Sequence, residues 1–447
     1  MREVSLYRRT MVRQAAAPVL SALAFFFVMT SYYIIRPLRD QLSGAVGSSE
    51  LPWFYITTLV VMLALTPVLG WLMARYSRRR LLGWSYGVVV VSLLAFMPAF
   101  TLQEQIGARN LGIAFFAWVS IFNLIVVTLF WSLMADIFSS LQARRLFSLI
   151  AFAGMAGALI GPFITASLVE IFGVPPMLGL SAFSLALALV ILLRLSRNDG
   201  SAAAGTTEEP IGGSLWAGLR QVLMQPFLRY MAILMLIGDG IGTLAYALMA
   251  DYAKASFHDA VARTAFYSNL DLAINGFGAL MQLTVTRWLL IRFGAGWGMV
   301  IPALTNLLLL SMIGIFGVVE FGTFHLGPVV LAVSTLSILQ VVTRGMAFGM
   351  TKPAVDALYT RVAREARYKG KSFIETTVWR FGDVLVSNGL NLLRSLGVGL
   401  AGIGLIGAGL SGLAAWLSHR ASHSPDLLPE HDARQRDGDQ AGGDVSR

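Results

Sequence analysis

The chain has 447 residues, of which 56% are hydrophobic and only 13% are charged, and its formal net charge is +10. Soluble domains carry about 25% charged residues, so this composition excludes an ordinary soluble protein. The chain contains no cysteine, which excludes disulfides, thiolate chemistry and cysteine-ligated metals. The basic residues are concentrated in short segments between apolar stretches, which favours a membrane protein with basic loops over a nucleic-acid-binding protein.

Twelve apolar stretches follow one another along the chain, and each is close to the length of about 20 residues that a helix needs to cross a bilayer. The first follows several arginines, as a signal peptide does. It is long and lacks a small-residue cleavage site, so we expect it to be retained as a span. The predicted spans are 15–37, 53–74, 81–100, 111–135, 146–170, 174–194, 228–250, 265–291, 297–319, 326–350, 372–393 and 396–417.

Most of the 34 Lys and Arg residues lie before the first span and in every second gap after it. The gap after the second span, for example, contains Arg75, Arg78, Arg79 and Arg80. Basic residues are retained on the cytoplasmic side of a membrane. The sequence therefore predicts an all-α, multi-pass protein of a bacterial inner membrane, with both termini in the cytoplasm.

The longest internal gap, 195–227, is rich in Gly, Ala and Thr and is typical of a flexible linker. It separates two sets of six spans, 1–194 and 228–418, and we expect it to lie in the cytoplasm. Two six-helix halves joined in this way are the plan of the major facilitator fold. The polar segment 419–447 is predicted to be a disordered cytoplasmic tail.

Two glycine-containing motifs resemble motifs of that fold. The loop from Gly70 to Arg80 resembles the facilitator loop motif, although Ala74 stands where an acidic residue is usual. Gly157 and Gly161, followed by Pro162, resemble a motif of facilitator antiporters. Small residues four positions apart also allow two helices to approach closely, and we favour this interpretation for the fifth span and for the glycine-rich twelfth.

The first span carries a group of polar residues near its end. Tyr32, Arg36 and Asp40 share one helical stripe, and Arg39 lies three residues beyond Arg36. A charge in the bilayer core costs about 2.5–3.5 kcal/mol, so such residues are candidates for a site. Asp40 can neutralise one guanidinium and leave the other for a phosphate-like group. The alternative is that the arginines extend to the headgroups, because Pro37 is expected to end the helix.

The second half carries more charged residues within its predicted spans. Asp239 lies near the middle of the seventh, and Asp271 and Asn275 lie one turn apart in the eighth. Internal pairing, such as Arg380 with Asp383 or Glu375, is the alternative to a binding site. The candidates for substrate binding are Arg36, Arg39, Arg344, Arg380, Tyr32 and Asn275. The candidates for proton coupling or charge pairing are Asp239, Asp271, Asp383, Glu375, Asp40 and Asp136.

All five histidines lie outside the predicted spans, so a proton relay would have to use carboxylates. No phosphate-binding Gly-rich loop, nucleophile elbow or metal-ligand spacing is present, and no gap is long enough for an ATPase domain. We therefore expect no enzyme activity, no cofactor and no bound metal. Transport would be secondary or driven by exchange.

Three stretches, 25–40, 130–147 and 352–383, resemble the nucleotide (ATP/ADP) translocases and their uncharacterised bacterial relatives. The resemblance implies exchange of nucleotides or related phosphorylated compounds, as in ATP:ADP antiporters, with Arg36, Arg39, Arg344 and Arg380 as candidates for phosphate contact. The established translocases carry a Lys where Arg39 stands. Their acidic residue in the fourth span has no clear counterpart unless Asp136 supplies it, and Asp136 could instead organise the nearby arginines of the following loop.

The leading hypothesis is a monomeric secondary transporter of an anionic, phosphorylated small molecule such as ATP or ADP, in contact with membrane lipids and not with nucleic acid. The second is a proton-coupled transporter or exporter of another organic solute, with Asp239 or Asp271 carrying the proton. The third is a transport-inactive membrane sensor or scaffold. Pairing of all the arginines with internal carboxylates would weaken the first hypothesis.

Overall fold

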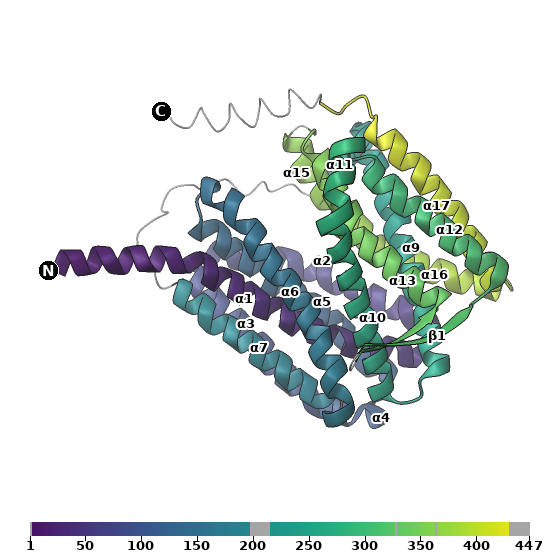
Figure 1. The fold of residues 1–447 in the computed structure, drawn as a ribbon, viewed down its shortest axis with the longest axis horizontal. Helices are drawn as coiled ribbons and strands as arrows, with labels where there is room; N and C mark the ends of the chain where they lie inside the picture. Colours follow the sequence, from purple (N-terminus) through teal and green to yellow (C-terminus); the bar gives the residue numbers. More distant parts are fainter. Residues whose placement is uncertain (1, 197–214, 327–328, 363, 429–447) are drawn as a thin grey trace. The chain divides into compact units, whose positions relative to one another are not determined.

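The computed structural model describes residues 2–196, 215–326, 329–362 and 364–428, and helices make up most of them (Figure 1). In the first part of the chain, the helices follow one another with short connections. They are α1 (Arg2–Val46), η1 (Ser48–Glu50), α2 (Leu51–Arg75), α3 (Arg78–Thr101), α4 (Gln103–Ile106), α5 (Ala108–Ile137), α6 (Ser140–Phe172) and α7 (Pro175–Leu195).

The second part of the chain contains three π-helical turns and one β-hairpin. Its elements are α8 (Leu215–Met224), α9 (Pro226–Ser256), α10 (Ala260–Met281), η2 (Gln282–Thr286), α11 (Arg287–Phe293), α12 (Trp297–Phe316), β1 (Glu320–Leu326), β2 (Val329–Ser334), α13 (Thr335–Met346), η3 (Ala347–Thr351), α14 (Lys352–Tyr359), α15 (Arg364–Phe373), η4 (Ile374–Val378), α16 (Trp379–Ser395) and α17 (Leu400–Ser422). The π turns are η2, η3 and η4. Such turns occur mostly as single interruptions of α-helices and are frequent at functional sites.

Nine helices in the described ranges are long and apolar enough to cross a membrane. The three other predicted spans, 265–291, 326–350 and 372–393, overlap the helical stretches that contain the π turns, and the second of them begins in strand. The predicted helical membrane fold is therefore supported. The number of twelve spans and their orientation stay predictions.

Two of the expected boundaries were wrong. Pro37 does not end the first helix, because α1 continues to Val46 and stops before Gly47, whose φ of +82° favours glycine. A missing hydrogen bond at a proline is tolerated where neighbouring helices hold the backbone. The predicted tenth span begins too early, because Leu326 belongs to β1 and Val329–Ser334 form β2. The helix itself starts at Thr335, where the Ser334 side chain accepts a hydrogen bond from the Ser337 backbone at 3.2 Å.

The predicted linker and tail are only partly covered. Within the linker 195–227, α8 forms from Leu215, and residues 197–214 lie outside the described residues. In the predicted tail, α17 continues to Ser422, and residues 429–447 lie outside the described residues. The prediction of disorder in the tail therefore stays a prediction for those residues.

The contacts divide the chain into two compact units. Unit 1 comprises Met1–Thr206, Ala250–Asn275 and Thr323–Ala332, and unit 2 comprises Thr207–Met249, Gly276–Gly322 and Val333–Arg447. In unit 1, α1 packs along α6, α7 and α5, and α3 packs along α7. In unit 2, α12 packs along α17, and α8 along α15. Figure 1 shows α3 beside α7 in unit 1 and α12 beside α17 in unit 2.

Small residues allow the closest of these approaches. A Cβ added at Gly161 of α6 would lie 2.8 Å from the Thr30 carbonyl oxygen of α1, and one added at Gly404 of α17 would lie 2.8 Å from the Gly314 backbone nitrogen of α12. Both helix pairs therefore depend on a position without a side chain. The expected packing role of the glycines in the fifth and twelfth spans agrees with this geometry.

Candidate functional site

A group of four charged side chains lies at the junction of α1 and α10 within unit 1. We call Arg36, Arg39, Asp40 and Asp271 the unit 1 cluster. Arg36 contacts Asp271 with a distance of 3.5 Å between Nη2 and Oδ1, and Asp40 with 3.9 Å between Nε and Oδ2. Arg39 binds Asp40 at 2.7 Å. The arginine side chains are only 13% and 14% exposed, so both guanidinium groups are buried beside carboxylates.

Aromatic rings surround these arginines. The Arg36 guanidinium carbon lies 5.5 Å from the centre of the Tyr33 ring, and that of Arg39 lies 4.5 Å from the Phe116 ring. Tyr32 stacks against Phe122 with 5.9 Å between ring centres. Guanidinium groups are attracted to ring faces at such distances. Arg39 is therefore held by Asp40 and Phe116 inside unit 1. This position differs from the alternative considered for the sequence, in which the arginine side chain extends to the lipid headgroups.

Asn275 lies one turn after Asp271 and attaches α10 to α6. Its side-chain nitrogen donates a hydrogen bond to the Ala158 carbonyl oxygen at 2.9 Å. The second N–H of this amide and its side-chain oxygen are left for a solute. The sequence predicted that Asn275 shares a helical stripe with Asp271. In the structure, the hydrogen bond of Asn275 to Ala158 holds α10, the helix that carries Asp271, against α6.

A second group of four charges lies within unit 2, on α9, α13 and α16. We call Asp239, Arg344, Arg380 and Asp383 the unit 2 cluster. Arg344 binds Asp239 at 3.0 Å, and Arg380 lies 3.6 Å from Asp383. The side chains of Asp239 and Asp383 are 13% and 6% exposed. Arg380 is therefore paired with Asp383 in the structure. This pairing was the predicted alternative to a role of Arg380 in binding.

Two neighbouring residues of α9 shape the unit 2 cluster. Thr243 donates a hydrogen bond to Asp383 at 2.6 Å. A Cβ added at Gly242 would lie 2.8 Å from the guanidinium carbon of Arg344, so Arg344 reaches its position because Gly242 has no side chain. The sequence analysis missed Thr243. Its position four residues after Asp239 places it on the same stripe, which is the signal that could have identified it.

Two carboxylates of these clusters keep an unused oxygen. Oδ2 of Asp239 and Oδ2 of Asp271 are buried and accept no hydrogen bond from the part of the chain that the structure describes. An ionised carboxylate offers about four acceptor sites. Each of these groups therefore has capacity for a polar group of a solute or for a proton.

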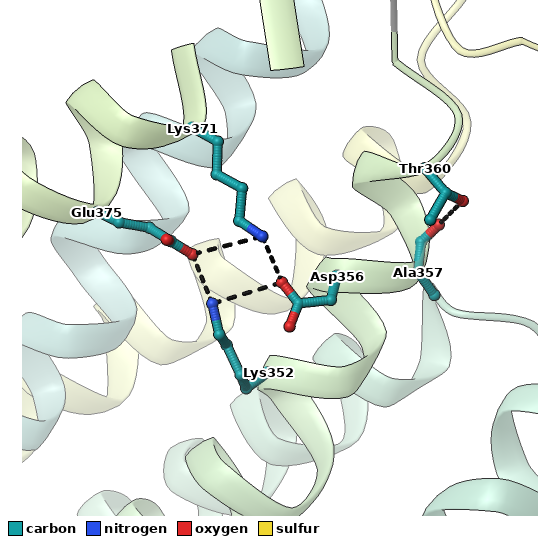
Figure 2. Close-up of polar contacts among 6 residues, drawn as sticks. All are labelled: Lys352, Asp356, Ala357, Thr360, Lys371 and Glu375. Carbon is teal, nitrogen blue, oxygen red and sulfur yellow. Dashed lines mark hydrogen bonds and ion pairs between the residues drawn. The ribbon is translucent and has the colours of Figure 1, made fainter. Parts of the chain in front are cut away.

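A third set of charges, which we call the charge ring, consists of Lys352, Asp356, Lys371 and Glu375, and Figure 2 shows its alternating signs. The distances are 2.5 Å from Lys352 to Glu375, 3.4 Å from Lys352 to Asp356, 2.8 Å from Lys371 to Asp356 and 3.9 Å from Lys371 to Glu375. Burial opposes the charged form of Lys352, but the hydrogen bond that Lys352 donates to Glu375 and the charges of Glu375 and Asp356 outweigh it and raise the pKa of Lys352. The ring connects α14 with α15 and η4.

Two of the predicted charged site residues, Glu375 and Asp136, lie outside both clusters. Glu375 belongs to the charge ring rather than to the unit 2 cluster. Asp136, at the end of α5, binds Arg78 at the start of α3 with 2.9 Å between Nε and Oδ2, and both side chains are more than a third exposed. Asp136 is therefore an exposed ion-pair partner of the basic loop after α2. Among the described residues there is no group of three or more side chains placed to hold a metal ion.

Comparison with known proteins gives matches at the level of family and fold. A family model described as "Major Facilitator Superfamily" matches residues 21–387. The chain is similar to a crystal structure of the nucleoside transporter NupG, with 15% identity, 90% of this chain and 99% of that chain covered, and a TM-score of 0.59. It is also similar to a bacterial homologue of the iron transporter ferroportin, with 12% identity, 92% and 99% covered, and a TM-score of 0.64.

The E. coli fucose:proton symporter FucP matches with 14% identity, 91% of this chain and 98% of that chain covered, and a TM-score of 0.55. No curated protein sequence matches the chain. These three proteins are named as a nucleoside transporter, a homologue of an iron transporter and a fucose symporter, so the shared fold does not select one cargo.

Proposed function

Since the chain belongs to the Major Facilitator Superfamily, we propose that it is a secondary transporter that moves a small anionic, phosphorylated and nucleotide-like solute by alternating access. The observation that supports this cargo is a buried guanidinium within a predicted span in each unit, Arg36 and Arg344. A guanidinium binds phosphate oxygens bidentately and keeps its charge when it is buried. The resemblance of three stretches to nucleotide translocases favours the same class of solute.

The charge of the two clusters restricts how an anion can bind. Each cluster contains two arginines and two aspartates, so its formal charge is zero. Each guanidinium is already paired with a carboxylate. An incoming phosphate can bind the guanidinium only if that carboxylate moves away or takes up a proton, because a buried carboxylate without its cation is costly. Asp239 and Asp271, with their unused oxygens, are the residues that we expect to respond. Binding of the anion would therefore be linked to release of another anion or to proton uptake.

A second candidate is proton-coupled transport of another organic solute. It is favoured by the same two buried carboxylates, which can accept a proton without breaking a hydrogen bond at their second oxygen. The complete pairing of the four arginines also fits a transport-inactive sensor or scaffold. A transport assay distinguishes the three.

We expect labelled ATP or ADP to enter proteoliposomes that contain the purified protein only when they are preloaded with nucleotide. In Arg36→Ala and Arg344→Ala, exchange should fall at least about tenfold, since a hydrogen bond to a charged group contributes about 1.5–3 kcal/mol. Arg109→Ala is the control, because Arg109 forms an exposed pair with Glu50 at 2.6 Å and lies outside both clusters. Its exchange should stay near that of the wild type.

Three other outcomes decide between the candidates. Uptake of a different solute that requires a pH gradient and fails in Asp239→Asn would support the proton-coupled transporter. Exchange that is unchanged in both arginine variants would reject the proposed site. Folded protein that transports none of these solutes under any gradient would reject the nucleotide hypothesis and favour the scaffold.

A further inference from the structure

A groove of about 980 Å³ runs along the exposed side of α3, with Leu193 of α7 on its other side. Gly83, Trp84, Gly87 and Val88 are among the residues that line it. Trp84 is 76% exposed and Val88 is 60% exposed.

The lining continues to Ala95, which is twelve residues, or about 18 Å of helix, beyond Gly83. One leaflet of a bilayer has a hydrocarbon thickness of about 15 Å, so the groove has the length of one acyl chain.

The opposite side of α3 is packed into unit 1. Tyr86 is fully buried and donates a hydrogen bond to the Val126 carbonyl oxygen at 2.8 Å. The groove, by contrast, is open space. A Cβ added at Gly87 would meet no atom within 4 Å, and one added at Gly83 would meet only Leu193, at 3.9 Å. No described side chain of the protein therefore fills the groove at Gly87.

Two arginines stand at the N-terminal end of this groove. Arg79 and Arg80 line it and are exposed, and neither has an ion pair with any residue in the described ranges. Their neighbour Arg78 differs, because it is bound to Asp136 at 2.9 Å. The end of an apolar groove with the length of an acyl chain thus carries two uncompensated positive charges. The basic loop is the one that we predict to be cytoplasmic, and the cytoplasmic leaflet contains the anionic lipids.

We propose that this groove binds one anionic phospholipid. The headgroup phosphate contacts Arg79 and Arg80, and one acyl chain lies over Gly83 and Gly87 between Trp84 and Leu193. Charge complementarity selects an anionic lipid over a zwitterionic one. An Arg side chain near the membrane surface is attracted to negatively charged headgroups. The site lies on the exposed side of α3, and its lining residues belong to neither charge cluster, so it does not depend on which solute is carried.

The test is native mass spectrometry of the purified full-length chain with phosphatidylglycerol, phosphatidylcholine or inorganic phosphate, together with thermal unfolding in each. We expect one tightly retained phosphatidylglycerol and a preference of about tenfold or more over phosphatidylcholine. Arg79→Gln with Arg80→Gln should remove the preference between lipids. Gly87→Trp should fill the groove and lower retention of phosphatidylglycerol about tenfold or more.

Gly409→Trp on α17 is the matched control, because a Cβ at Gly409 also meets no atom within 4 Å. It should leave lipid retention unchanged. Equal binding of the two lipids by the wild type, or unchanged retention in folded Gly87→Trp protein, would overturn the proposal. A stabilisation by inorganic phosphate equal to that by phosphatidylglycerol would overturn it as well, since the acyl groove would then contribute nothing.

Discussion

Replacement of Arg344 by methionine is expected to lower the free energy of unfolding by about 3–5 kcal/mol, because Asp239 would keep a buried charge without its cation. The two side chains are 3.0 Å apart and 18% and 13% exposed. The double variant Arg344→Met with Asp239→Asn should recover most of the loss, since it removes both charges. Denaturation of the purified protein in detergent, analysed as a double-mutant cycle, measures the coupling.

The control for this cycle is the exposed pair of Arg109 with Glu50, in which the Arg109 side chain is 46% exposed. Removal of Arg109 should change the free energy of unfolding by less than about 1 kcal/mol. If Arg344→Met lowers the stability no more than this control, the pair of Arg344 with Asp239 is solvated and the buried cluster does not exist as described.

Replacement of Gly161 by leucine is expected to prevent α6 from packing on α1. An added Cβ would lie 2.8 Å from both the Thr30 carbonyl oxygen and the Tyr33 Cβ, so the backbone of α1 would have to move. Overpacking of a core costs about 1–3 kcal/mol and sometimes more, and a backbone atom yields less readily than a side chain. Gel filtration and thermal unfolding should show little monodisperse protein, with a milder effect in Gly161→Ala.

Gly70→Leu is the matched control for that variant, because Gly70 also lies in a long apolar helix and a Cβ there would meet no atom within 4 Å. We expect this variant to behave as the wild type does. Equal yields of folded Gly161→Leu and Gly70→Leu protein would contradict the close approach of α1 and α6.

The helical membrane fold could be predicted from sequence because it depends on local quantities. The length of each apolar stretch and the positions of basic residues are local, and they lead to the facilitator fold. The end of α1 could not be predicted in the same way. Pro37 breaks isolated helices, but in this chain the surrounding helices hold α1 intact as far as Val46. Strand β2 was missed because its residues, Val329–Ser334, are as apolar as those of a span.

The candidate site could be predicted only within single helices. The step of four residues from Arg36 to Asp40 and of three from Arg380 to Asp383 both correspond to contacts in the structure. The partners Asp271 and Asp239 lie more than a hundred residues from the arginines that they bind. Helical phase shows which residues share a face, but it does not show which faces meet.

The neutrality of the clusters has an electrical consequence. Moving one elementary charge across a membrane potential of 100 mV requires about 2.3 kcal/mol. The two arginines and two aspartates of one cluster have a summed charge of zero, so moving the whole cluster across that field would require no net electrical work. Reorientation of the empty protein would then be insensitive to voltage as far as these residues are concerned. The charge of the cargo, and of any proton carried with it, would make transport electrogenic, so the voltage dependence of flux would report the net charge carried in each cycle.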